Sequence, residues 1–189
     1  SMLGETLVDV IRRRNMSDQS KIGSPKWQRA VRTVDWITTQ VPATSQFQIY
    51  GFNTQVSPLL KGTLGQWQAT QGGSRLSAAV QALKSKVPQQ GTSLENAFKA
   101  AASLSPRPDS IFLLTDGLPT QDASGTRKGL VNGDKRARYF RDALKSLPSG
   151  VPVNVILFPM EGDPIAASAY WQLARSTGGA FLSPPRDWP

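Results

Sequence analysis

The chain has 189 residues, a net charge of +9, and neither cysteine nor histidine. This length suits one domain with a hydrophobic core, so we expect residues 1–189 to form a single domain. The missing residue types exclude disulfides, thiolate catalysis, histidine acid–base chemistry and the usual zinc sites. Any metal must therefore be a hard ion held by oxygen atoms, such as Mg²⁺, Mn²⁺ or Ca²⁺.

The predicted elements alternate between helices and strands. Helical segments carry apolar residues every three to four positions, and short apolar runs mark the strands. In the first half we predict a short helix within 3–14, a polar loop at 15–24, a helix from Pro25 to before Pro42, strands at 47–52 and 66–69, and a helix at 74–86. In the second half we predict a helix at 93–104, a strand at 110–115, a loop at 117–133, a helix at 134–147, a strand at 151–158, a helix from 164 to 177, a strand at 180–182 and a Pro-rich tail at 184–189.

This alternation predicts an α/β fold with a doubly wound, mostly parallel sheet flanked by helices. Ser24-Pro25 and Asp163-Pro164 are each expected to cap the helix that follows them. The predicted order begins with a helix, although such sheets normally open with a central strand. The usual first strand is therefore missing, and its absence would leave two unpaired strand edges.

The most informative stretch is the apolar run Ile111–Leu114, which ends at Asp116-Gly117. The run suits a strand covered on both faces, and a carboxylate at the carboxyl end of such a strand lies where open α/β sheets bind ligands. Thr92 or Ser93 is expected as the N-cap of the helix over 93–104. A hydroxyl would then lie near the carboxylate, although taken alone both residues are most often simple caps.

The positive charge raises nucleic acid, anionic lipid or an acidic protein as partners. The basic residues are scattered, and the sequence has no basic motif interleaved with aromatic residues of the RNA-binding type. We therefore expect a solvated basic surface rather than a nucleic-acid interface. No run approaches the ~18 apolar residues that a membrane span needs. The absence of cysteine fits any compartment.

Motifs for catalysis are missing. The sequence has no phosphate-binding loop, no Gly-x-Gly-x-x-Gly after a strand and no Gly-x-Ser-x-Gly elbow. A pair of carboxylates for glycoside hydrolysis would have to join Asp116 with Asp122, Asp163 or Glu95, and nothing in the spacing favours this over solvated loop acids. We therefore do not expect an enzyme.

The segments Gly91-Thr92-Ser93-Leu94 and Ile111–Gly117 resemble the later parts of the metal-ion-dependent adhesion site of von Willebrand factor A domains. That site begins with Asp-x-Ser-x-Ser at the end of the first strand, often followed by Met, and Ser1-Met2 resembles its last Ser and Met. The order of the other elements also matches, with residues 3–24 resembling an insertion before the first helix. The resemblance is closest to bacterial A-domain proteins, some of which are carried on longer membrane-anchored chains.

The resemblance implies Ser1, Thr92 and Asp116 as metal-site residues, with Mg²⁺, Mn²⁺ or Ca²⁺ as the ion. Because the first acid and first serine of the motif are missing, it implies weak Mg²⁺ binding for this chain. It also implies an interaction or adhesion module, in which the cation accepts an acidic side chain of a partner protein. The loops after Phe52, around Thr92 and from Gly117 to Asn132 would form the contact face.

Two other classes of function remain open at this stage. One is a Mg²⁺-dependent enzyme or a chelatase-associated subunit, which turnover of generic phosphoesters would support. The other is a basic nucleic-acid-binding domain, which a steep salt dependence of binding would support. The sequence names neither the partner nor the compartment.

Overall fold

The computed structural model describes residues 2–125, 131–185 and 187–188. Its helices are α1 (Leu7–Arg14), α2 (Asp18–Ile22), α3 (Pro25–Thr39), α4 (Ser74–Lys84), α5 (Leu94–Ala102), α6 (Gly133–Leu144) and α7 (Pro164–Thr177). Its strands are β1 (Gln46–Phe47), β2 (Tyr50–Phe52), β3 (Val56–Pro58), β4 (Gln68–Ala69), β5 (Ile111–Thr115), β6 (Val153–Leu157) and β7 (Phe181–Leu182). None of the helices in these ranges is long and apolar enough to cross a membrane.

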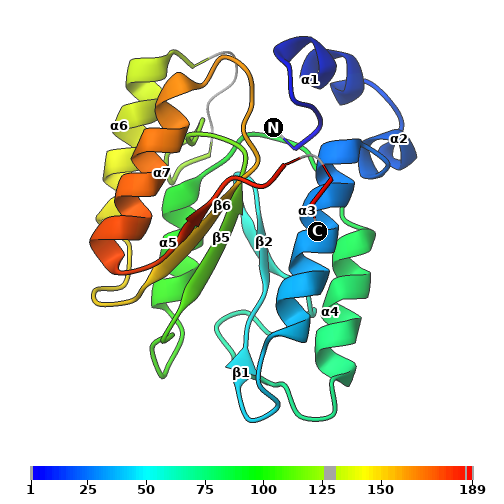
Figure 1. Cartoon of the computed structure of the whole chain (residues 1–189), viewed down its shortest axis with the longest axis vertical. Coiled ribbons are helices and arrows are strands. Elements are labelled where there is room, and N and C mark those ends of the chain that lie inside the picture. Colours follow the sequence, from blue (N-terminus) through cyan, green and yellow to red (C-terminus); the bar gives the residue numbers. More distant parts are fainter. Residues whose placement is uncertain (1, 126–130, 186, 189) are drawn as a thin grey trace.

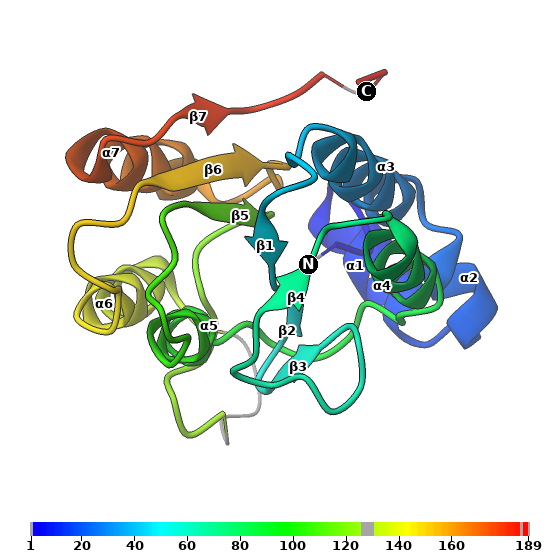
Figure 2. The same cartoon turned by 90° about the horizontal axis from the view of Figure 1, so that it is seen from below.

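The centre of the fold is a parallel sheet in the order β5-β6-β7, with Leu113 opposite Val155 and Ile156 opposite Leu182. Helices α3 and α4 lie on one side of the strands and α5, α6 and α7 on the other, as two perpendicular views show (Figures 1 and 2). Parallel strands joined by helices, with helices on both faces, confirm the predicted α/β architecture.

The remaining strands form two antiparallel pairs, β1 with β4 and β2 with β3. Within the described ranges β5 pairs only with β6, and β2 pairs only with β3. Each of these strands therefore keeps one edge without a ladder, as the absence of the first strand predicts. The parallel sheet and the β2-β3 pair consequently remain separate instead of joining into one sheet.

The hydrophobic core is divided between the two sides of the strands. Side chains of α5, α6 and α7 pack on one face of β5 and β6; the buried members are Leu94, Phe98, Leu113, Leu118, Phe140, Ala143, Val153, Val155, Leu157, Ala166, Tyr170, Leu173 and Ala174. On the other side, Ala30 of α3 packs against Ile156 and Phe158. A separate cluster joins α3, α4 and β1. Both faces of β6 are thus covered, which explains its unbroken apolar run.

Two short elements were not predicted from the sequence. The expected polar loop contains α2, a five-residue helix that Ser17 caps at the backbone N–H of Ser20 and that buries no side chain. The expected strand at 47–52 is divided into β1 and β2, and β3 follows it in a hairpin. A helix without a buried face lacks the apolar periodicity on which such predictions depend.

Gly179 is predicted to be intolerant of any side chain. A Cβ atom there would lie under 3.0 Å from the backbone N, C and O of Val153, in the buried strand β6. Since backbone cannot rotate away as a side chain can, we expect Gly179→Ala to lower the free energy of unfolding by about 2–3 kcal/mol in urea denaturation. Gly133→Ala is the matched control because a Cβ there meets nothing within 4 Å. Equal stability of the two variants would contradict the prediction.

Candidate functional site

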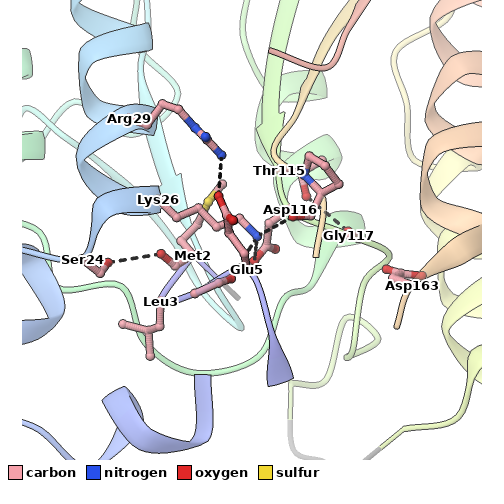
Figure 3. A network of polar contacts seen from close by, with 12 residues as sticks. Met2, Leu3, Glu5, Ser24, Lys26, Arg29, Thr115, Asp116, Gly117 and Asp163 are labelled. Carbon is pink, nitrogen blue, oxygen red and sulfur yellow. Dashed lines mark hydrogen bonds and ion pairs between the residues drawn. The ribbon is translucent and has the colours of Figure 1, made fainter. Parts of the chain in front are cut away.

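The candidate site lies at the carboxyl ends of β5 and β6, where α3 begins. Asp116 directly follows β5 and is buried, with 7% of the whole residue exposed. Lys26, the second residue of α3, reaches toward Asp116 from the opposite side (Figure 3). The buried run of β5 ends there because a polar residue and Gly117 follow it, as the sequence predicts.

A cavity of about 220 Å³ opens beside Asp116. Two of the three predicted ligand residues, Thr92 and Asp116, line it together with Trp27, Phe52 and Lys86. The structure thus brings Thr92 and Asp116 to one cavity, although they are separated by a helix and a strand in the chain. Ser1, the third predicted ligand, lies outside the described residues.

Thr92 is held in place by its backbone. Its N–H donates to Thr120 Oγ1 at 2.9 Å, and its carbonyl accepts from the N–H groups of Thr120 and Gln121, each at 3.0 Å. Ser93, not Thr92, caps α5, accepting from the N–H of Asn96 at 3.4 Å. Within the described residues, the Thr92 hydroxyl makes no hydrogen bond, so its oxygen is available to a ligand in the cavity.

The loops around the cavity are fastened together by Asn96 of α5. Its Nδ2 donates to the carbonyls of Thr54 and Ala123, both at 3.0 Å. Thr54 Oγ1 also donates to Gln90 Oε1 at 2.9 Å. Three segments therefore converge on the rim of the cavity: the turn after β2, the loop before α5 and the loop after β5. The sequence did not single out Asn96 as the residue that joins them.

Lys26 is the second charged group of the site. Lys26 is 2% exposed as a whole residue, and its Nζ lies 3.7 Å from Asp116 Oδ2. The ammonium also donates to the carbonyls of Gly4 and Pro159, both at 3.1 Å. Burial lowers the pKa of Lys26 below its ordinary value, against the attraction of Asp116 and Glu5. For Asp116, burial favours the neutral acid, but nearby cations, Lys26 and Arg136 among them, outweigh it and lower the pKa.

The segment before α1 covers Lys26 and is anchored by several contacts. Ser24 Oγ donates to the carbonyl of Met2 at 3.3 Å, and Arg13 Nη1 donates to that of Leu3 at 2.7 Å. Glu5 Oε1 lies 3.5 Å from Arg29 Nη2 (Figure 3). Residues 2–5 thus lie against Lys26, and Gly4 accepts a hydrogen bond from its buried ammonium. Ser24 is the N-cap residue of α3 and Pro25 begins the helix, as predicted, but the Ser24 hydroxyl donates to Met2 instead of accepting from the first turn.

The turn after Asp116 is positioned by a second ion pair, Arg136–Asp163. Arg136 Nη2 lies 2.6 Å from Asp163 Oδ2, and the side chains are 12% and 5% exposed. Asp163 Oδ2 also accepts from the N–H of Leu118 at 2.8 Å, and Arg136 Nη2 donates to the Leu118 carbonyl at 2.7 Å. Asp163 is the N-cap residue of α7, as predicted, but its carboxylate makes no hydrogen bond to the first turn of the helix and accepts from the N–H of Leu118 instead.

Thr92 and Asp116 fit a hard cation by the chemistry of their donors, a hydroxyl and an ionised carboxylate facing one cavity. Within the described ranges, no group of three or more acidic, histidine or cysteine side chains gathers as a metal cluster. Among the described residues that line the cavity, Asp116 is the acidic one, and Lys26 lies against it.

Comparison with known proteins identifies the family. The model of the von Willebrand factor type A domain matches residues 16–137 and 122–170. The search among curated proteins returned no match. Among solved structures, a von Willebrand factor type A protein from Catenulispora acidiphila superposes with a TM-score of 0.59 at 15% sequence identity.

That superposition covers 90% of this chain and 37% of the other chain, so this chain spans little more than a third of its structural relative. At this identity the likeness concerns the fold, and it agrees with the helices and parallel strands described above. The family model adds a match over more than half of the residues. The chain therefore belongs to the von Willebrand factor type A domain family.

Proposed function

We propose that this domain binds a partner protein by engaging an acidic side chain through a divalent cation held beside Thr92 and Asp116. The family makes the chain an interaction or adhesion module in general terms. What supports the finer proposal is that these two oxygen donors line one cavity whose rim is built from three converging loops. A bound cation would supply positive charge and an open coordination position for a carboxylate oxygen.

Three parts of the chain would have separate roles in binding. Asp116 would hold the cation by charge, Thr92 would add its hydroxyl oxygen, and the loops fastened by Asn96 would contact the surroundings of the partner's acidic residue. Mg²⁺, Mn²⁺ and Ca²⁺ all suit such ligands. The proposal is one of binding, without a catalytic step.

The proposal is tested with peptides. Immobilised heptapeptides of random sequence with a central Asp are compared with the same set carrying Asn, in Mn²⁺ and in EDTA. We expect binding that requires both Mn²⁺ and the Asp, and that weakens about tenfold or more in Thr92→Val because one metal ligand is lost. Thr92→Val should keep the stability of the parent chain, since no described residue hydrogen-bonds that hydroxyl. Equal binding of the Asp and Asn sets in Mn²⁺ would refute the proposal.

A further inference from the structure

The surroundings of the Lys26 ammonium resemble a cation site made of oxygen atoms. Two carbonyls, those of Gly4 and Pro159, lie at 3.1 Å, and Asp116 Oδ2 lies at 3.7 Å. Two of the three N–H groups of the ammonium donate to these carbonyls, and the carboxylate is the third oxygen group around it, at ion-pair distance. The three oxygens come from three separate parts of the chain: the segment before α1, the turn after β5 and the end of β6.

Burial of this ammonium needs a compensating partner. A lysine in a site that water does not reach loses its hydration, which costs free energy unless an opposite charge replaces it. The Lys26 side chain is 1% exposed and that of Asp116 9% exposed, so the two charges face each other with little solvent screening. The carboxylate that would hold a divalent cation is thus already matched by a positive charge of the chain itself.

We infer that the Lys26 ammonium occupies the cation position of this site. Its positive charge repels a divalent cation at Asp116 and so lowers the affinity of the site for metal. This inference rests on the proposed metal site and concerns its regulation by the chain's own residues. A cation about 2.1 Å from Asp116 Oδ2 would lie within roughly 6 Å of the ammonium. Two cations at that separation in a buried site repel each other strongly. For metal to bind, therefore, either the Lys26 ammonium must move away from the three oxygen atoms around it, or the repulsion must reduce the affinity for the metal.

The test is a calorimetric titration of Mn²⁺ into the parent chain and into Lys26→Gln. Glutamine removes the charge while its amide N–H groups can still donate to the carbonyls of Gly4 and Pro159. We expect Lys26→Gln to bind Mn²⁺ about tenfold or more tightly than the parent chain, with one site per chain. Lys26→Arg keeps the positive charge and should show no such gain. Lys145→Gln makes the same change of net charge at an exposed position, where the lysine side chain is 77% exposed.

A second measurement covers the possibility that Lys26→Gln is too unstable for calorimetry. A ligand that binds only the folded state raises its melting temperature. Saturating Mn²⁺ should therefore raise the melting temperature of Lys26→Gln, and of Lys26→Met as a second neutral variant, more than that of the parent chain. Equal affinities and equal shifts in the neutral variants and the parent chain would overturn the inference.

The outcomes separate this inference from the proposed function. If the parent chain and Lys26→Gln bind Mn²⁺ equally well and both capture Asp peptides, the proposed function stands and the inference fails. If Lys26→Gln gains Mn²⁺ affinity but captures no Asp peptide, the inference stands and the proposed function fails. If neither chain binds Mn²⁺ in calorimetry or melting, both fail.

Discussion

Asp116→Ala is expected to lower the free energy of unfolding at neutral pH by about 3–5 kcal/mol. The substitution leaves the Lys26 ammonium, whose side chain is 1% exposed, without the carboxylate 3.7 Å away. Removing one partner of a buried ion pair leaves an uncompensated charge buried. This lowers the free energy of unfolding far more than replacing both partners with apolar side chains does. Urea denaturation of the variant and the parent chain measures the difference. Asp35→Ala, which breaks a half-exposed pair with Lys84, should cost below about 1 kcal/mol.

The pair also predicts how the loss depends on pH. Because nearby cations lower the pKa of Asp116 in the folded chain, its stabilising contribution is complete above the ordinary Asp range and is lost as pH falls through the folded-state pKa. The gap between Asp116→Ala and the parent chain should therefore narrow in acid. Combining Asp116→Ala with Lys26→Met should cost less than the sum of the single changes, since no lone charge remains. Additive costs would show that the two side chains do not interact.

Much of the fold followed from local patterns in the sequence. The apolar run Ile111–Leu114 and the acid after it located β5 and the ligand edge, because a buried parallel strand has an unbroken apolar run. The helical pattern that follows predicted a hydroxyl of Thr92 or Ser93 near that acid, and the family resemblance singled out Thr92. Both predictions depend on a few adjacent residues, and the structure places the two at one cavity.

The other half of the site could not be predicted because it depends on contacts between distant residues. Lys26 carries no local feature that separates it from a solvated lysine at the start of a helix. Its carbonyl partners lie 22 and 133 positions away in the chain. Asp163 before Pro164 has the sequence of a helix cap, but its carboxylate binds an N–H group 45 positions away. Where a polar group is buried, the partners that tertiary structure offers decide its role, and local preference is overridden.

Asp163→Ala is the second change with a large expected effect. Asp163 Oδ2 accepts from the N–H of Leu118 and lies 2.6 Å from Arg136 Nη2, and its side chain is 5% exposed. Its removal leaves a mostly buried guanidinium without its counter-ion and a backbone N–H without its acceptor. We expect a loss of about 3–5 kcal/mol in the free energy of unfolding, measured by urea denaturation. Asp142→Ala, which breaks the exposed pair with Lys145, is the matched control and should leave the free energy of unfolding close to that of the parent chain.

A second variant separates charge from hydrogen bonding. In Asp163→Asn the amide oxygen can still accept from Leu118, so roughly half of the loss should be recovered even though the charge is gone. Hydrogen exchange of the Leu118 amide supplies an independent readout, since its protection should fall in Asp163→Ala and persist in Asp163→Asn. Asp163→Ala with parental stability and parental protection of Leu118 would contradict the assignment. If the losses occur, the turn that follows Asp116 is held by α6 and by the start of α7, and the orientation of the candidate ligand depends on a pair of residues that do not touch the cavity.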